Sequence, residues 1–371
     1  MEYKSYQISI SELIKMIESD SIELHPSYQR NYIWTIPDQK FLIDSIHKEY
    51  PLPNFFVYRR NPKLLEMVDG QQRAVTIFRY FKGEFKDNQR NLYSSTDTEQ
   101  FLNYKLNIIE ITKIFKERGE SLEEFYWMVN KRGKHLNTPE VNKARYHNSD
   151  FLKIVYSVMS NPILDDLDIF TTKVKTRMND RSLVEELIAY LFDGITDKRN
   201  AVEKLFKDSI SETKQKEVEE RANRILSRID LLNSEYPISD TRYKQRNDFY
   251  TLWNFIDQNE SETDNELIEQ YKILLFISKN GFITPSNDEC EPFKNYALNC
   301  VSQSNSKKAR EGRLQFFYDI LCNKDIDNNQ SLLDIETYFE DIYDIDSLPL
   351  KKVGDYQLMD VSKLELKGNG E

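Results

Sequence analysis

Apolar residues in the first third of the chain alternate between helical and strand-like spacing. Residues 9–19 and 35–50 each start with a residue suited to cap a helix, a serine in the first and Thr35 with Pro37 in the second. Both stretches then show helical periodicity and predict amphipathic helices. The side chains expected to face the core are Leu13, Ile14 and Ile17 in the first helix and Phe41, Leu42, Ile43 and Ile46 in the second.

A strand, a tight turn and a helix start are predicted next. Two short apolar runs, 54–60 and 64–69, are separated by an Asn-Pro-Lys turn, which predicts two strands joined by a short connection. The second run ends at Asp69-Gly70. Residues 71–81 then return to helical spacing, and a further strand is predicted over 104–112. The side chains expected on the buried face of the helix over 71–81 are Val75, Ile77, Phe78 and Phe81.

Beyond about residue 120 the pattern is almost entirely helical. Ser121 followed by Glu124 has the spacing of a capping box, and amphipathic periodicity continues from there toward the C-terminal end. The predicted fold class is α+β. We expect a mixed α/β domain over 1–118, a mainly α-helical domain over 119–353 and a polar tail over 354–371.

Length and charge narrow the function classes. A chain of 371 residues is long for one core, which favours two domains. The chain has no apolar run long enough to span a membrane and no basic-then-apolar leader after Met1, so we expect a cytoplasmic protein without a membrane partner. The net charge of −11 means that any attraction to nucleic acid must come from local basic patches. Three basic concentrations, 131–145, 173–181 and 307–313, are candidates, although each alone is equally typical of a solvated face.

The cysteines carry no sign of a metal or redox centre. Cys290, Cys300 and Cys322 are odd in number and lack CxxC spacing. We therefore expect ordinary buried thiols.

Candidate chemistry first appears where the strand ending at Asp69 meets the following helix. A helix N-terminus offers backbone N–H groups and partial positive charge to an anion. Gly70 would allow close approach of a ligand, and Arg73 offers a fork of donors to a phosphate or carboxylate. Asp69 could hold a metal, orient Arg73 or act as a base. An ordinary Asp-Gly turn with a solvent-facing arginine explains these residues equally well.

A second polar and aromatic cluster lies upstream, in residues 27–35. Arg30 stands among Tyr28, Tyr32 and Trp34 in a predicted loop, and loops carry a large share of binding residues. Together with the turn at Asp69, this cluster favours a binding site over an ordinary Asp-Gly turn.

The two clusters and the elements between them resemble the DGQQR-motif domain of GmrSD-type restriction systems, a branch of the ParB/sulfiredoxin-like superfamily. The shared order is an arginine-bearing loop, a helix, a strand, and a strand leading into "DGQQR", Asp69 to Arg73. The resemblance implies a ParB/sulfiredoxin-like N-terminal domain and a nucleoside triphosphate, with Mg²⁺, bound at this turn. The implied nucleotide-binding residues are Gln29, Arg30, Gly70, Gln71, Gln72 and Arg73, the implied catalytic residues are Asp69, Arg73 and Arg30, and the implied metal ligand is Asp69.

A second signature of the same family follows at 125–151. Its pattern is an aromatic run and then Asn-x-x-Gly-x-x-Leu, followed by Ser or Thr and an acidic residue. The matching places are occupied by Asn130, Arg132, Gly133, Leu136, Thr138 and Glu140, with Asn137 between Leu136 and Thr138. A helix–turn–helix junction with Gly133 as C-cap explains the same residues locally. The resemblance implies DNA as a partner, phage DNA and modified DNA included. The candidate DNA-binding residues are Tyr32, Trp34, Asn130, Lys131, Arg132, Lys134, His135 and Lys143.

No nuclease module is expected in this chain. All four histidines fall in the first 150 residues, so the remainder of the sequence lacks the histidine metal ligands of the HNH nuclease that accompanies many such domains. P-loop, GxGxxG, GxSxG and HExxH motifs are also absent from the sequence. Any triphosphate hydrolysis would therefore use the turn at Asp69 to Arg73.

Three functional hypotheses remain open. The first is a defence protein that binds a nucleoside triphosphate and senses DNA, in which Arg73 faces Arg30 across an anion pocket and Arg73→Ala abolishes binding but leaves the fold intact. The second is a hydrolase that excises a base from modified phage DNA with Asp69 as catalytic carboxylate. The third is a non-enzymatic sensor that partners a separate nuclease subunit. A homodimer is compatible with all three.

Overall fold

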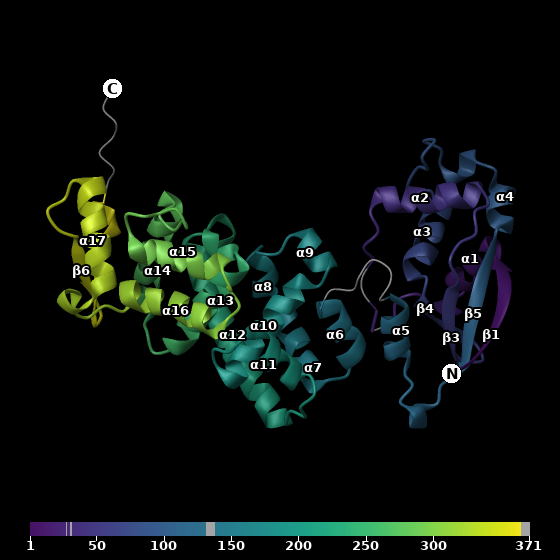
Figure 1. Ribbon diagram of the computed structural model, residues 1–371, viewed down its shortest axis with the longest axis horizontal. Coiled ribbons are helices and arrows are strands. Elements are labelled where there is room, and N and C mark those ends of the chain that lie inside the picture. Colours follow the sequence, from purple (N-terminus) through teal and green to yellow (C-terminus); the bar gives the residue numbers. More distant parts are fainter. Residues whose placement is uncertain (27, 30–31, 131–137, 365–371) are drawn as a thin grey trace. The chain divides into compact units, whose positions relative to one another are not determined.

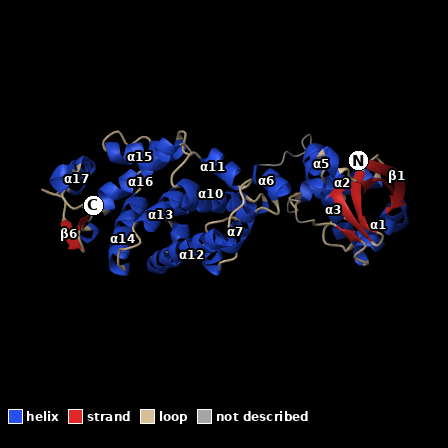
Figure 2. Ribbon diagram, turned by 90° about the horizontal axis from the view of Figure 1, so that it is seen from below, coloured by secondary structure: helices blue, strands red, loops and turns tan. Residues whose placement is uncertain are grey.

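The computed structural model describes residues 1–26, 28–29, 32–130 and 138–364. The chain forms two compact units, one made of Met1–His147 with Thr172–Asn179 and the other of Asn148–Thr171 with Asp180–Glu371. The first contains a mixed sheet with helices, and the second is mainly helical (Figures 1 and 2). The predicted α+β class is confirmed. The predicted boundary at residue 118 falls inside the first unit.

The first unit is built on a five-stranded sheet of order β1-β5-β3-β4-β2. Its strands are β1 (Glu2–Ser9), β2 (Ile22–Glu23), β3 (Phe55–Asn61), β4 (Leu64–Asp69) and β5 (Lys105–Lys113). β1 and β5 pair antiparallel, as do β3 and β4, whereas β3 with β5 and β2 with β4 are parallel. The two strands predicted around the Asn-Pro-Lys turn are therefore confirmed as an antiparallel pair, with Val57 opposite Met67.

Helix starts in this unit follow the predicted capping residues. Ser9 caps the first helix in a capping box with Glu12, and Thr35 forms a capping box with Asp38 at the start of the second. Ser121 accepts a 3.0 Å hydrogen bond from the backbone N–H of Glu124. The helices of the unit are α1 (Ile10–Glu18), α2 (Ile36–His47), α3 (Gln71–Phe81), α4 (Thr98–Asn103), α5 (Leu122–Asn130), α6 (Thr138–Tyr146) and α9 (Thr172–Thr176).

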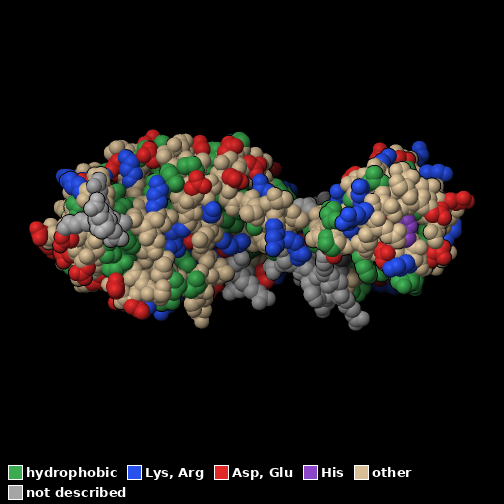
Figure 3. All heavy atoms as spheres, turned by 90° about the horizontal axis from the view of Figure 1, so that it is seen from above, with side chains coloured by type: hydrophobic (Ala, Val, Ile, Leu, Met, Phe, Trp, Pro, Cys, Tyr) green, Lys and Arg blue, Asp and Glu red, His purple; other side chains and the backbone are tan. Residues whose placement is uncertain are grey.

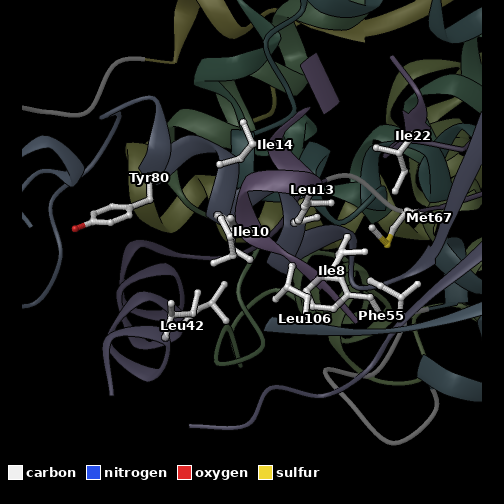
Figure 4. Packing of buried hydrophobic residues seen from close by; sticks show 14 of the residues in the cluster. Ile8, Ile10, Leu13, Ile14, Ile22, Leu42, Phe55, Met67, Tyr80 and Leu106 are labelled. Atoms are coloured by element: carbon white, nitrogen blue, oxygen red, sulfur yellow. The ribbon is translucent and has the colours of Figure 1, made fainter. Parts of the chain in front are cut away.

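The main core of the unit lies between the sheet and helices α1 to α4 (Figure 4). Leu13 from α1, Phe55 from β3 and Met67 from β4 are among its buried side chains. Successive strand residues point to opposite faces, so Val68 faces away from Met67. On that opposite face Val68 joins a smaller cluster with Tyr126 of α5. The packing of α5 on this sheet face explains why the unit continues beyond residue 118.

Two predicted helix faces need correction. On α2, Leu42 is buried at 4% exposure, but Phe41 is 72% exposed, because the core-facing positions are 39, 42, 43 and 46 and residue 41 points away from them. On α3, Ile77 is buried as predicted, but Ala74 and Tyr80 complete the buried stripe. Val75, Phe78 and Phe81 are only partly buried.

The second unit consists of α-helices that end in a short hairpin. Its helices are α7 (Asp150–Met159), α8 (Pro162–Asp166), α10 (Asn179–Asp193), α11 (Lys198–Leu205), α12 (Glu212–Glu235), α13 (Arg246–Gln258), α14 (Asp264–Asn280), α15 (Glu291–Val301), α16 (Lys307–Leu321) and α17 (Gln330–Tyr343). Strands β6 (Leu350–Val353) and β7 (Tyr356–Met359) pair antiparallel. Residues 354–359, predicted to begin a polar tail, thus form part of this hairpin, and Leu358 is fully buried.

Among the described residues, no helix combines the length and the apolar character needed to cross a membrane.

Candidate functional site

The turn between β4 and α3 requires a glycine. β4 ends at Asp69, α3 begins at Gln71, and Gly70 between them has φ of +107°, in the left-handed region. A Cβ atom on Gly70 would lie 2.5 Å from Cδ1 of Phe55. The backbone here is packed directly against the Phe55 ring.

Arg73 is turned toward the protein. Its guanidinium donates hydrogen bonds to the backbone oxygens of Pro53 and Asn54, the latter at 3.0 Å, and lies 3.0 Å from Oδ2 of Asp69. The group also stacks on Phe55, 4.4 Å from the ring centroid. Burial lowers the pKa of Arg73, and the carboxylate of Asp69 opposes that shift.

These contacts give Arg73 a role in the fold. Its side chain ties the first turn of α3 to the segment that enters β3. The residue is only 9% exposed. Arg73→Ala would remove these hydrogen bonds, so the prediction that this substitution leaves the fold intact has to be tested by measuring stability alongside nucleotide binding.

Gln72 joins the upstream aromatic segment to α3. Its Oε1 atom accepts hydrogen bonds from the backbone N–H groups of Ile33, at 2.8 Å, and Trp34, at 3.2 Å. One turn further along, the hydroxyls of Tyr32 and Thr76 lie 2.8 Å apart. Residues 32–34 are therefore held against the first two turns of α3.

The residues before this segment are held by β4 and by Gln71. Gln29 donates from Nε2 to the backbone oxygens of Met67 and of Val68, the latter at 3.1 Å. Nε2 of Gln71 lies 2.8 Å from Nδ1 of His25. The structure thus brings together the two clusters that the sequence placed about 40 residues apart, and four of the predicted site residues, Gln29, Gln71, Gln72 and Arg73, are buried at this junction.

A fully buried carboxylate lies next to the junction. The hydroxyl of Tyr28 donates a 2.6 Å hydrogen bond to Glu66, and Nη2 of Arg60 is 3.0 Å from the other carboxylate oxygen. Burial, reinforced by the hydrogen bond to Glu66, raises the pKa of Tyr28. Tyr28 therefore serves as a neutral hydrogen-bond donor that fixes Glu66.

The aromatic residues predicted to contact DNA are partly engaged within the unit. The ring of Tyr32 lies 5.4 Å from the Arg79 guanidinium, and Trp34 is half-buried against the main core. Their proposed contacts with bases remain predictions.

Several of the predicted binding residues lie outside the part of the chain that the structure describes. Arg30, Lys131, Arg132, Lys134 and His135 are outside the described residues, and so is the predicted arrangement of Arg30 opposite Arg73. Asn130 is the last residue of α5, and its side chain is not described. Lys143 lies in α6 and is half-buried.

In two of the three basic concentrations, arginines are engaged in contacts within the fold. Arg310 and Arg313, from the stretch 307–313, are 4% and 0% exposed. In the stretch 173–181, Arg177 pairs with Glu140 at 3.1 Å and Arg181 with Glu185 at 2.8 Å. These arginines do not form a phosphate-tracking surface. On the face shown in Figure 3, basic side chains are scattered among acidic and uncharged ones.

Sequence reasoning missed several partners at the junction. Asp69 and Arg73 are four residues apart across the start of a helix, a spacing that predicts their ion pair. His25, Thr76 and the carbonyls of Pro53 and Asn54 had no such local signal, because their contacts depend on how the loops fold back onto the sheet.

A family described as the N-terminal domain of GmrSD restriction endonucleases matches residues 10–353. No curated protein and no solved structure matched the chain.

Proposed function

The chain belongs to the family of GmrSD restriction endonuclease N-terminal domains, which makes it a restriction-type phage-defence protein, and we propose that it binds a nucleoside triphosphate at the turn from Asp69 to Arg73. The observation that carries this proposal is the pair of hydrogen bonds from Ile33 and Trp34 to Gln72. They hold residues 33 and 34 against the N-terminus of α3, where an anion is favoured.

We propose different roles for the two arginines. Arg73 braces the turn and adds positive charge behind it, partly balanced by Asp69 at 3.0 Å. Arg30 is proposed to approach the phosphates from the segment that Gln29 and Tyr32 anchor on either side. Gly70 supplies the left-handed backbone that lets α3 begin directly after β4 at the proposed site.

Mg²⁺ fits this proposal as a companion of the nucleotide. Among the described residues, no group of three His, Cys, Asp or Glu side chains could hold a metal ion. Mg²⁺ is commonly held by one or two carboxylates together with substrate phosphates and water. Asp69, with 28% of its side chain exposed, would be the protein ligand and Arg73 would orient it.

DNA recognition is proposed for the segment around 130–143 of the same unit. Because the net charge is −11, phosphate contacts must be concentrated on a few basic residues. Lys143, together with Asn130, Lys131, Arg132, Lys134 and His135, supplies them in this proposal. Modified phage DNA is the proposed target and the nucleotide site is proposed to report its binding.

Hydrolysis of the four ribonucleoside triphosphates, each with host DNA, modified phage DNA or no DNA, tests the proposal. We expect one nucleotide to be hydrolysed faster with modified DNA, and Asp69→Asn to remove that stimulation while an exposed Glu99→Gln control retains it. Binding without hydrolysis would make the protein a sensor for a separate nuclease. Release of abasic sites without any nucleotide requirement would overturn the nucleotide proposal in favour of base excision.

A further inference from the structure

The second unit carries a groove that the nucleotide proposal does not use. It has a volume of about 580 Å³ and lies between α15, α16 and α17. This size is within the range of pockets that hold small ligands or a few side chains. Its polar lining includes side-chain amides and carboxylates from all three helices.

Gly312 shapes the groove. It lies inside α16, and a Cβ atom added there would come within 2.7 Å of Nδ2 of Asn299 on α15. The missing side chain lets α15 approach α16 closely. Leu298, on the same groove, is 39% exposed, so the polar lining is accompanied by an accessible apolar side chain.

Three carboxylates of the groove accept hydrogen bonds from uncharged side chains. Glu291 accepts from Asn295 at 3.2 Å, and Asp334 accepts from Gln330 at 2.7 Å. Asp319 accepts from Gln315 and from Ser331, each at 2.7 Å. Within the described part of the chain, none of the three carboxylates forms an ion pair with a lysine or arginine.

Two buried carboxylates of this unit, by contrast, are neutralised by arginines. Asp257 pairs with Arg221 at 2.6 Å, and Glu186 binds both Arg246 and Arg310. The groove is therefore a place where negative charge is left for a ligand to balance. Each donated amide N–H also leaves an amide carbonyl oxygen at the groove that can accept a further hydrogen bond.

From this complementarity we propose that the groove docks a short segment of a partner protein that bears lysine or arginine and an apolar residue. The cationic heads would bind the three carboxylates and the amide carbonyls, and the apolar residue would cover Leu298. A nucleic acid would be repelled by the carboxylates. A bare metal ion does not fit, because no group of three acidic or other metal-binding side chains in the described chain is close enough to hold one.

Fluorescence anisotropy with the full-length protein tests the proposal. The probe is a fluorescein-labelled dodecapeptide of alternating lysine, leucine, arginine and serine, titrated at about 0.15 M salt. The groove variant Glu291→Gln/Asp319→Asn/Asp334→Asn is expected to weaken binding at least tenfold. The control Glu212→Gln/Glu220→Gln/Asp240→Asn changes the net charge equally at exposed positions of the same unit and is expected to change affinity less than twofold.

Equal weakening by both triple variants would overturn the proposal, since it would mean that the peptide follows net charge alone. Displacement of the peptide by duplex DNA would overturn it as well. If the groove triple variant fails to fold, as judged by circular dichroism, Leu298→Ser serves in its place. That variant is expected to weaken peptide binding at least threefold, and unchanged binding would contradict the proposed apolar contact.

Discussion

Single residues at the β4–α3 turn are constrained by close packing as much as by any ligand. Gly70 combines a left-handed φ with direct contact to Phe55. Arg73 satisfies two backbone carbonyls and Asp69 while stacking on the same ring. The residues proposed to serve the nucleotide therefore also hold the turn in shape, so their substitutions must be judged on stability and on binding.

Gly70→Ala should destabilise the first unit strongly. The left-handed backbone costs an alanine about 1–2 kcal/mol, and displacing Phe55 adds about 1–3 kcal/mol. Gly83→Ala is the matched control, because Gly83 also has a positive φ, +75°, but a Cβ there meets nothing within 4 Å. Urea denaturation of both variants checks this prediction. Equal losses of unfolding free energy would show that contact with Phe55 is unimportant.

At the scale of single residues, the sequence predicts which residue type a position needs better than it predicts which residues that side chain contacts. The Asp69–Arg73 pair follows from helical spacing, and the need for glycine follows from the strand-to-helix turn. The bonds from Arg73 to Pro53 and Asn54 could not be predicted, because they join segments about 20 residues apart through loop geometry. Gln72 was assigned to a ligand, yet its Oε1 atom binds backbone N–H groups of its own chain.

At the scale of elements, adjacent residues of α2 lie on opposite sides of the boundary between core and solvent. Leu42→Ala should cost about 2–5 kcal/mol of unfolding free energy, because Leu42 is buried in the main core. Phe41→Ala on the adjacent, exposed position should change it by less than about 0.5 kcal/mol. Thermal unfolding of the two variants distinguishes them. A large loss with Phe41→Ala would reveal that this exposed ring is covered by something in solution.

A second group of contacts between elements joins three strands of the sheet. Glu110 of β5 accepts hydrogen bonds from Arg59 of β3, at 2.5 and 3.0 Å, and from Tyr6 of β1, at 2.8 Å. The bonds from Arg59, with a further contribution from Tyr6, lower the pKa of Glu110 to about 2, against the burial that opposes the shift.

Because this pKa is lower in the folded state, Glu110 contributes stability above the unfolded-state pKa of 4.5, and the contribution is lost as pH falls toward 2. The difference in unfolding free energy between the native protein and Glu110→Gln should therefore shrink between these pH values. Denaturant unfolding at a series of pH values measures it. The unfolding free energy of the exposed Glu99→Gln variant should follow the same pH dependence as that of the native protein. If Glu110→Gln also follows it, the lowered pKa of Glu110 is contradicted.

Element prediction succeeded where capping and periodicity agreed. α1, α2 and α5 begin next to the predicted caps Ser9, Thr35 and Ser121. β1 was missed because most of its side chains are exposed and give no strong alternation. β7 was missed because the polar residues around it resemble a tail, although Leu358 and Met359 are buried.

For the molecule as a whole, charge decides where nucleic acid could bind. The net charge is −11, and arginines from two of the three predicted basic stretches are used inside the fold. The two-part organisation was predictable from the change of periodicity along the chain. The inward turn of Arg310 and Arg313 was not, because a buried arginine and a solvated one have the same sequence signal until their partners are known.

DNA affinity should accordingly depend on few basic residues. If Lys143 contacts a phosphate, Lys143→Gln should lower the slope of log affinity against log salt concentration by about 0.9. Lys216→Gln, at an exposed position of α12, should leave the slope unchanged. Filter binding of one duplex over a salt series measures both. Identical slopes for the native protein and Lys143→Gln would exclude this residue from the phosphate contacts.

Nucleotide binding at the first turn of α3 is the central proposal, and calorimetric titration with each ribonucleoside triphosphate in the presence of Mg²⁺ tests it directly. Gln72→Glu keeps an acceptor for the N–H groups of Ile33 and Trp34 but places a negative charge beside the proposed phosphate position. We predict that the native protein and the exposed control Gln7→Glu bind the same nucleotide equally, and that Gln72→Glu binds it at least about tenfold more weakly. Failure of the native protein to bind any of the nucleotides, or undiminished binding by Gln72→Glu, would contradict it.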